Sequence, residues 1–284
     1  MGIVKCLEGR LVAMEYYDTI NYRGWVKSFN MQQLERAAEN KLHNYLKHLK
    51  GFLEHEKERF EVIRYEDIKK AHLGLFTTKA PYYFVVYITD LEVQLLNAGY
   101  LMGQFSLYLM TKEIGSCLVG LEEVKKYVSS NVMVRSDTID ESKPLEQRTW
   151  VAIMAFGNPE HKFRQKRKKL GEIISDKKCI YKSEMDPRVQ AIISAGVHAP
   201  SKMMIRPYRF VVKGLRAHLL VKVESMMTAS QRMCVYLDCG IMLASLSLKA
   251  EEQWMTMEIR RNEKHVETQQ KKYKYIVSLS FEDQ

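Results

Sequence analysis

The chain has 284 residues, of which 46% are hydrophobic and 27% are charged. This balance is typical of a folded globular protein with a sizeable core, and it argues against a disordered or collagen-like chain. The net charge of +10 favours anionic partners such as a phosphate-bearing cofactor. Because no nucleic-acid-binding motif accompanies the charge, we expect no nucleic acid partner.

The five cysteines are widely scattered and include no C-x-x-C pair. Their spacing argues against a disulfide framework and against a zinc site, so we expect no metal. It favours free thiols in a reducing, cytoplasmic location. Residues 1–13 are expected to be an extension. Charges at Lys5, Glu8 and Arg10 leave that extension without the apolar core of a secretory signal.

The first element that the pattern predicts is a long helix after Asn30. Asn30 and Gln33 are spaced as a capping box. The apolar residues that follow recur at helical spacing, which indicates one buried face. These residues are Met31, Leu34, Ala38, Leu42, Tyr45, Leu49 and Leu53.

Two similar strands are predicted, "PYYFVVYITD" at 81–90 and "PYRFVVKGLR" at 207–216. Each precedes an apolar helix, "NAGYLMGQFSLYL" from Asn97 and "DCGIMLASLSLKA" from Asp238. When Gly99 is set against Gly240, small and large apolar residues fall at matching positions. The pattern predicts two helices that are buried on most sides, with small residues where backbones come close.

The first of these helices includes an uncharged stretch, 93–110, of almost membrane-spanning length. Its polar side chains favour a buried helix of the core, and we expect no membrane span. These side chains are Gln94, Asn97, Gln104 and Ser106.

An apolar strand closes each half of the chain, at 149–159 and at 273–283. Strand, buried helix and strand therefore recur in one order, which predicts an internal duplication. The second half holds about 15 more residues between its first strand and its helix. We expect halves of 14–160 and 161–284, intertwined as one globular unit.

The second half is expected to begin with a helix capped by Asp186, with Pro187 at its first position. Pro200 is expected to end this helix. Its predicted apolar face consists of Val189, Ile192, Ile193 and Val197.

Three motifs follow one another along the chain: "NYRGWVKSFN" at 21–30, "KEIGSCLVG" at 112–120 and "HAPSKMMIRPYRFVV" at 198–212. Together they resemble the FMN-dependent nitroreductase family. More closely, they resemble its subgroup in which two related halves are fused in one chain that imitates a dimer. The resemblance covers the chain from Met14 onward.

In the first motif the resemblance assigns Arg23 and Lys27 to the phosphate tail and pyrimidine edge of the flavin, with Trp25 in the place of a family serine. On a helix, residues four apart share one face, so we expect a paired basic grip. In the second motif the resemblance places the backbone of Gly115, Ser116 and Cys117 near the flavin ring. Cys117 itself is expected to be a small buried residue and not a nucleophile.

In the third motif Pro200 and Ser201 match the family, while Met204 stands at its asparagine position and Arg206 at its glutamine position. Met204 cannot donate the hydrogen bond that the asparagine gives the flavin, although its sulfur can pack against the ring. Arg206 is a candidate replacement donor. After "AFGNP" comes a basic segment in which Lys178 resembles a phosphate ligand of the two-half subgroup.

The resemblance implies an α+β fold: a nitroreductase-like sandwich with a central, mostly antiparallel sheet, helices on both faces and two pseudo-equivalent halves. FMN is expected at the interface of the halves, and NAD(P)H is expected to reduce it in a ping-pong reaction. The acceptor is expected to be a small nitroaromatic or quinone-like molecule. No catalytic side chain is required, because the cofactor carries the chemistry.

The chain is expected to work as a monomer, since its second half replaces a partner subunit. The alternative is a diverged, non-catalytic protein that binds flavin or another planar ligand on the same scaffold. Substitutions at the positions of Met204 and Arg206 keep this alternative open.

Overall fold

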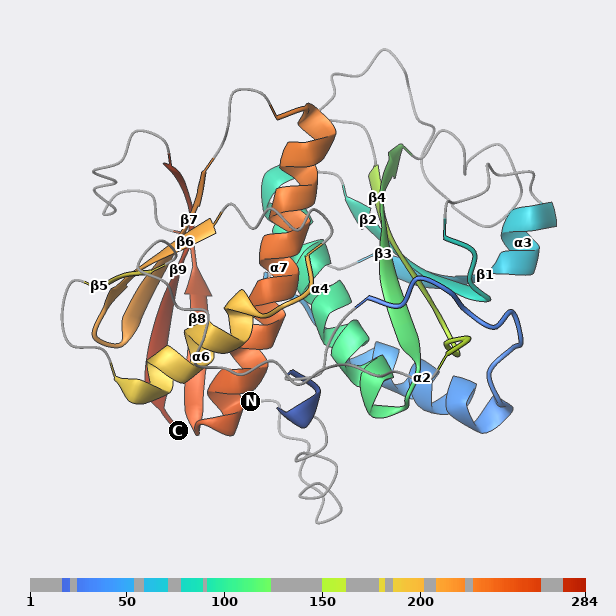
Figure 1. Ribbon diagram of the computed structural model, residues 1–284, viewed down its shortest axis with the longest axis horizontal. Coiled ribbons are helices and arrows are strands. Elements are labelled where there is room, and N and C mark those ends of the chain that lie inside the picture. The colour runs from blue at the N-terminus through green and yellow to red at the C-terminus, as the bar shows by residue number, and fades with distance from the viewer. Residues whose placement is uncertain are drawn as a thin grey trace. The chain divides into compact units, whose positions relative to one another are not determined.

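The structure is a computed structural model (Figure 1). It describes residues 17–20, 25–53, 59–70, 78–88, 91–123, 150–161, 179–181, 186–201, 208–222, 227–261 and 273–284. The chain forms two compact units. Unit 1 consists of Met1–Arg23, Gln165–Val235 and Met242–Gln284, and unit 2 consists of Gly24–Arg164 and Tyr236–Ile241.

Unit 2 contains a four-stranded antiparallel sheet in the order β1-β2-β4-β3. Its strands are β1 (Phe60–Arg64), β2 (Tyr82–Ile88), β3 (Gly115–Glu123) and β4 (Trp150–Gly157). Its helices are α2 (Arg36–His48), α3 (Tyr65–Lys70) and α4 (Leu91–Thr111).

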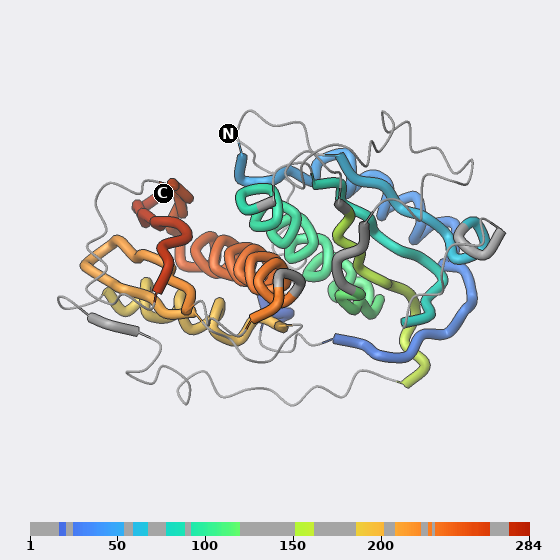
Figure 2. Tube along the Cα trace, turned by 90° about the horizontal axis from the view of Figure 1, so that it is seen from above, coloured from blue at the N-terminus to red at the C-terminus, as the bar shows by residue number. Residues whose placement is uncertain are grey.

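Helix α4 lies along one face of this sheet (Figures 1 and 2). Phe105 of α4 packs on Phe84 and Phe156, with ring centroids 4.6 and 5.3 Å apart. The other face carries Tyr83, Val85 and neighbouring buried side chains, and the segment 25–29 packs against them. Alternate residues of one strand thus enter different layers, as the pleat of a strand requires.

Unit 1 contains a five-stranded sheet in the order β5-β6-β7-β9-β8. Its strands are β5 (Cys179–Tyr181), β6 (Tyr208–Lys213), β7 (Arg216–Lys222), β8 (Met255–Arg260) and β9 (Tyr273–Asp283). Its helices are α6 (Pro187–Val197) and α7 (Ala229–Glu252), although Tyr236–Ile241 of α7 count in unit 2. Among the described strands, β5 and β6 form the one parallel pair.

The expected α+β class with mainly antiparallel strands is confirmed, and the strands divide between two sheets. Within each sheet, two strands, a long helix and two further strands follow in sequence. The spatial orders, β1-β2-β4-β3 and β6-β7-β9-β8, are the same. The internal duplication itself stays a prediction.

The strands "PYYFVV" and "PYRFVV" were expected to be equivalent, but they take different places in their sheets. The first is β2, which leads to α4 and pairs with β4, whereas the second is β6, which is followed by β7. Strand β7 pairs with β9 and so takes the place in its sheet that β2 takes in the other. The additional residues of the second half contain β7. Short apolar strands resemble one another regardless of their place in a sheet, which explains the misleading match.

The helix expected from Asn30 begins later, at Arg36, and ends at His48. The side chain of Asn30 accepts a hydrogen bond from the backbone N–H of Gln32 at 2.7 Å and so forms a local turn. Phe29 is bridged to Pro159 in the same stretch. Both interactions hold the chain out of a helix just before α2. Leu34 and Leu49 are buried although they lie outside the helix.

Helix α6 agrees with its prediction. The side chain of Asp186 accepts a hydrogen bond from the backbone N–H of Arg188 at 2.7 Å, and Pro187 opens the helix. The predicted apolar face is buried in full: Val189, Ile192, Ile193 and Val197.

The two apolar helices are buried core helices. Among the described residues, one stretch, Gln231–Glu252 of α7, is long and apolar enough to cross a membrane, and 72% of its apolar window is buried inside the protein. Burial to this extent is typical of a core helix. In α4, residues such as Leu101, Met102 and Phe105 have no exposed surface.

The predicted close approach of small residues occurs within unit 2, where Gly99 of α4 meets Gly240 of α7. A Cβ added to Gly99 would lie 2.9 Å from the carbonyl carbon of Leu237 and 3.0 Å from the Cα of Gly240. A Cβ added to Gly240 would lie 2.7 Å from the backbone nitrogen of Tyr100. Real side chains do not tolerate such distances from backbone atoms, so glycine is required at both positions.

We therefore expect Gly240→Leu to lower the free energy of unfolding by about 2–4 kcal/mol, because the helix backbones must separate. Gly214→Asn is the control. Gly214 has a positive φ of 55° that asparagine tolerates, and no atom lies within 4 Å of an added Cβ. Urea unfolding is expected to give a change within about 1 kcal/mol for the control. Equal losses of unfolding free energy in Gly240→Leu and Gly214→Asn would contradict the conclusion that glycine is required at position 240.

Candidate functional site

The first motif is extended where the structure describes it. Residues 25–30 contain no helix, so the helix expected around Lys27 is wrong, while the pairing of Lys27 with Arg23 stays a prediction. The backbone N–H of Val26 donates to the carbonyl of Ser116 at 2.9 Å. Lys27 is exposed, while Arg23 lies outside the described residues. Pairing with the edge of β3 and with Pro159 replaces the helix.

The backbone bond from Val26 brings the first and second motifs together in unit 2. A Cβ on Gly115 would lie 2.6 Å from Cγ2 of Val26. The glycine of the second motif therefore admits the first motif at close range. Its neighbour Ser116 is 4% exposed, and its Oγ lies 2.8 Å from the Oγ of Ser106 on α4. This hydrogen bond fixes the start of β3 to the core helix.

Trp25 packs on the sheet face opposite α4, against a buried cluster that includes Phe29, Tyr83, Cys117 and Ala155. The thiol of Cys117 is buried there, as expected for a residue that is not a nucleophile. The indole Nε1 of Trp25 is also buried, and among the described residues it has no hydrogen-bond partner. A buried N–H without an acceptor costs about 1–3 kcal/mol. This group is therefore available to a ligand that brings an acceptor.

The third motif follows α6 in unit 1. The backbone N–H of Ala199 donates to Gly196 at 3.0 Å, and Pro200 is buried while Ser201 is half-buried. The ring Nδ1 of His198 lies 2.6 Å from the carbonyl of Ser194. Because a carbonyl only accepts, this nitrogen carries a proton.

Three predicted site residues of the second half, Lys178, Met204 and Arg206, lie outside the described residues. Trp25, Lys27, Gly115, Ser116 and Cys117 lie in unit 2, and Pro200 and Ser201 lie in unit 1.

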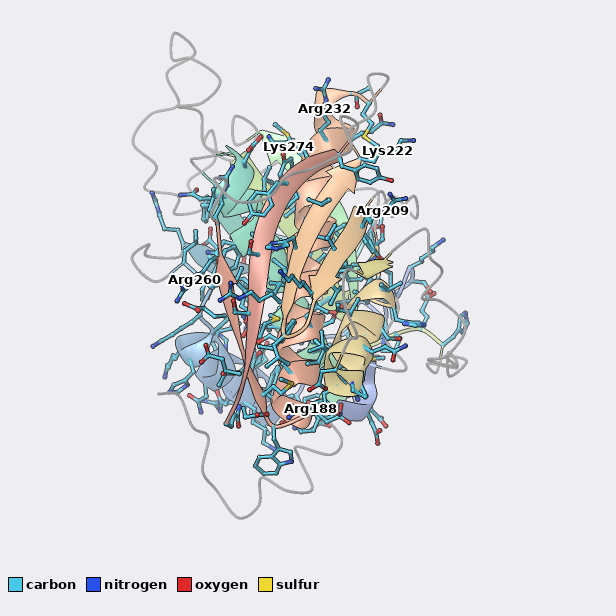
Figure 3. All side chains as sticks on the ribbon, turned by 90° about the vertical axis from the view of Figure 1, so that its left-hand side faces the viewer. Arg188, Arg209, Lys222, Arg232, Arg260 and Lys274 are labelled. Carbon is cyan, nitrogen blue, oxygen red and sulfur yellow. The ribbon has the colours of Figure 1, made fainter. Side chains whose placement is uncertain are left out.

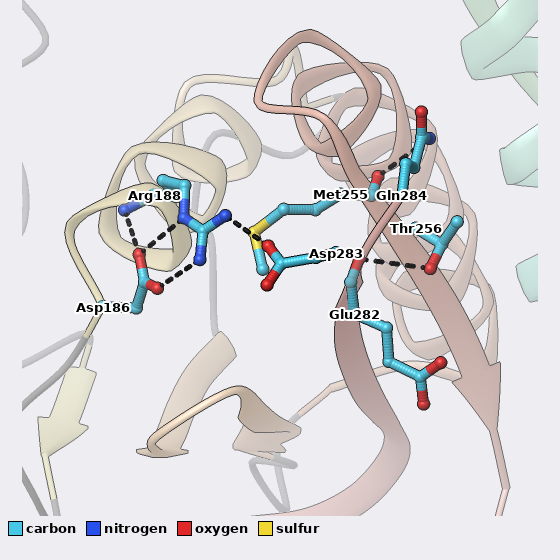
Figure 4. A network of polar contacts seen from close by, with 7 residues as sticks. All are labelled: Asp186, Arg188, Met255, Thr256, Glu282, Asp283 and Gln284. Carbon is cyan, nitrogen blue, oxygen red and sulfur yellow. Dashed lines mark hydrogen bonds and ion pairs between the residues drawn. The ribbon is translucent and has the colours of Figure 1, made fainter.

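Arg188 anchors the start of α6. Its guanidinium forms ion pairs with Asp186, with Nη2 and Oδ2 2.8 Å apart, and with Asp283 near the C-terminus (Figure 4). The hydrogen bonds from the Arg188 side chain are the main cause that lowers the pKa of Asp186. The two ion pairs hold the start of α6, and this helix leads directly into the third motif with Pro200 and Ser201.

Basic side chains on the unit 1 sheet were not singled out from the sequence. Figure 3 shows Arg209, Lys222 and Lys274 towards one end of this sheet and Arg188 towards the other. The guanidinium of Arg209 lies 4.7 Å from the ring centroid of Tyr273, within the range of a cation–π contact. Strand register brings Arg209, Lys222 and Lys274 to the same end of the sheet, although they are far apart in sequence.

Within the described part of the chain, no group of three or more His, Cys, Asp or Glu side chains is arranged to hold a metal ion.

The family to which the chain belongs follows from comparison with known proteins. The family model described as "Putative TM nitroreductase" matches residues 15–250. The chain belongs to this family. The sequence-based assignment to nitroreductases is thereby confirmed at the family level, and the match begins close to Met14. This membership supports an oxidoreductase. No curated protein matches the chain.

The nitroreductase fold is shared with a Thermotoga maritima protein described as a "putative nitroreductase", at 17% identity and a TM-score of 0.57, over 93% of each chain. A Clostridium difficile FMN-dependent nitroreductase matches at 12% identity and a TM-score of 0.38, over 56% of this chain and 98% of its own. A Bacteroides thetaiotaomicron protein described as a "putative NADH dehydrogenase/NAD(P)H nitroreductase" matches at 17% identity and a TM-score of 0.39, over 56% of this chain and 95% of its own.

For a nitroreductase-family protein, the described residues fit a flavin in two respects. The buried Nε1–H of Trp25 offers a donor to a carbonyl or ring nitrogen. Lys27 offers an exposed cation on the same segment.

The Ser106–Ser116 hydrogen bond generates one prediction. Ser106→Ala leaves the buried Oγ of Ser116 without this partner, so the free energy of unfolding is expected to fall by about 1–2 kcal/mol. The double variant Ser106→Ala/Ser116→Ala is expected to lose less than the sum of the single losses, since neither polar atom then remains. Chemical denaturation of the four proteins measures this coupling. Strictly additive losses would rule the interaction out as a stabilising one.

The Asp186 cap generates a second prediction. Because the pKa of Asp186 is lowered from 3.8 in the folded state, its ionised form stabilises the fold above about pH 4, and this contribution is lost as the pH falls through the lowered value. Asp186→Asn keeps a capping oxygen but removes the charge. Urea unfolding at decreasing pH measures this. At neutral pH the free energy of unfolding is expected to be higher for the wild type than for Asp186→Asn, and the difference is expected to disappear in acid. A pH-independent difference would contradict this.

Proposed function

We propose that the chain is a flavin-dependent oxidoreductase that binds FMN and transfers hydride from NAD(P)H to a small nitroaromatic or quinone-like acceptor. Membership of the nitroreductase family supports the reaction class. The observation that carries the site is the backbone bond between Val26 and Ser116, because it unites two motifs that lie far apart in the sequence.

Within this proposal, Lys27 and Arg23 bind the phosphate and ribityl tail of FMN. The exposed ammonium of Lys27 is free to form charge-assisted hydrogen bonds with phosphate oxygens. The indole of Trp25 donates its buried N–H to an acceptor atom of the cofactor. The backbone of Gly115–Cys117 orients the ring, held in place by Ser106.

The second half is proposed to complete a single site with Pro200, Ser201, Met204 and Arg206, and Lys178 is proposed to contact the phosphate. Bound FMN supplies the hydride chemistry, while the protein binds, orients and excludes water. Since one chain contains both halves, we propose that it acts as a monomer in the cytoplasm.

A second candidate function is flavin or planar-ligand binding without turnover. It is favoured by Met204, which cannot donate the hydrogen bond that the family asparagine provides. The two functions differ in whether a bound flavin is reduced by a nicotinamide nucleotide.

The test is an absorbance spectrum of the purified protein with added FMN, followed by titration with NADH and with NADPH in the absence of oxygen. A bound flavin spectrum that bleaches on titration supports the reductase. Binding without bleaching supports the second candidate, and no binding of FMN overturns both flavin proposals.

The double variant Arg23→Ala/Lys27→Ala is expected to raise the Kd for FMN about 100-fold, because each lost charge-assisted bond contributes at least about 1.4 kcal/mol. Lys41→Ala, an exposed cation of α2, is the matched control and is expected to leave the Kd unchanged. Fluorescence titration of FMN measures both. An unchanged Kd in the double variant would remove these residues from the site.

A further inference from the structure

A small pocket in unit 2 lies between α2 and the strands β1, β2 and β4. Its volume is about 70 Å³, several times the roughly 10–15 Å³ that one water needs. Its apolar walls are formed by Leu34, Leu42, Val62 and Phe156. None of its lining residues belongs to the three motifs of the candidate flavin site.

One side of the pocket is a buried polar relay that ends at Glu39. The backbone N–H of Leu34 donates to Oη of Tyr82 at 3.0 Å, and the Tyr82 hydroxyl donates to Oε1 of Glu39 at 2.6 Å. Burial, followed by the hydrogen bond to Glu39, raises the pKa of Tyr82 to about 12. Tyr82 therefore keeps its proton at neutral pH and orients the Glu39 carboxyl towards the pocket.

The two oxygens of Glu39 differ in their partners. Oε1 accepts the hydrogen bond from the Tyr82 hydroxyl and also lies 3.2 Å from Nη2 of Arg64. Oε2 lies 3.5 Å from the same nitrogen. Among the described residues, no other donor reaches Oε2. A distance of 3.5 Å is at the limit of a hydrogen bond, so this oxygen has unused acceptor capacity. The Glu39 side chain is only 19% exposed, which limits its access to water.

The rim of the pocket carries His43 and Arg64. His43 Nδ1 lies 2.8 Å from the main-chain carbonyl of Glu39 and so carries the proton that this bond requires. Arg64 is 49% exposed and touches Glu39 through one nitrogen only. An exposed pair of this kind contributes about 0–1 kcal/mol, so Arg64 moves aside at little cost.

We propose that this pocket binds a small primary amine, whose ammonium group donates to Oε2 of Glu39 and whose short aliphatic body packs against Leu42 and Phe156. An apolar cavity with one convergent polar group is the usual form of a small-molecule site. A carboxylate ligand is disfavoured because the Glu39 carboxylate would repel it. The pocket has less than half of the ~150 Å³ that a cavity needs to hold a benzene ring, so the body is restricted to a few carbon atoms. This site is independent of the proposed flavin function.

The experiment uses the full-length protein and the probe propylamine at neutral pH. Isothermal titration is expected to give a Kd of about 1 mM, in keeping with a ligand of few atoms. Saturation-transfer NMR is expected to place the propyl chain beside Phe156. Butyrate, which has the same propyl body and the opposite charge, is expected not to bind.

Glu39→Gln retains an oxygen for the Tyr82 hydroxyl and removes the charge, so it is expected to keep the fold and to weaken the binding of propylamine about 10-fold or more. Leu42→Phe fills the cavity and is expected to abolish binding. Glu35→Gln, an exposed carboxylate just before α2, is the matched control and is expected to bind as wild type does. Thermal melts of each variant confirm folding.

Three outcomes would overturn the proposal: no binding of propylamine to the wild type, equal binding of propylamine to Glu39→Gln, or equal binding of butyrate to the wild type. FMN titration is a separate measurement. If the amine proposal fails, the flavin proposal is unaffected, and if the flavin proposal fails, the amine proposal is unaffected.

Discussion

The packing of unit 2 depends on the place where α4 and the central residues of α7 touch through their backbones. Gly99 and Gly240 leave no room for a side chain there, and the helices can approach this closely only with glycine at both positions. Most described side chains of α4 are buried, and the sheet of unit 2 packs against this helix. Phe105 then meets Phe84 and Phe156, and Ser106 meets Ser116.

Hydrogen bonds that start at α4 explain where the residues of the first two motifs lie. Ser116 is fixed by a hydrogen bond to α4, and its carbonyl in turn accepts the backbone N–H of Val26. The first motif is therefore attached to the second through the start of β3. Trp25 is left on the opposite sheet face with its indole N–H buried. A packed helix thus positions the first motif, which is itself neither helix nor regular strand where the structure describes it.

The two proposed binding places of unit 2 use different faces of one sheet. Tyr83 packs in the cluster that holds Trp25, whereas its neighbour Tyr82 donates to Glu39 in the small pocket. Successive residues of a strand point to opposite faces, so two adjacent tyrosines serve two separate environments. The sheet between them is filled by buried aromatic and aliphatic side chains, which allows each place to be altered without the other.

Local pattern determined much of this protein. The apolar runs gave the buried helices α4 and α7, the Asp186–Pro187 pair gave the start of α6, and the strand period gave β9 at 273–283, because each depends on interactions between near neighbours. The three motifs also gave the family, since their order and spacing can be read without coordinates.

Tertiary structure alone decided the rest. The sequence could not show that "PYRFVV" is β6 and that β7 takes the position matching β2, because strand pairing is a long-range choice. It could not show that residues 25–30 are extended, since the bonds to Ser116 and Asn158 compete successfully with local helix preference. The Glu39 pocket likewise requires Arg64, Tyr82 and Phe156 to converge on α2. Such convergence is a property of packing, whereas a pattern along the chain records only local preference.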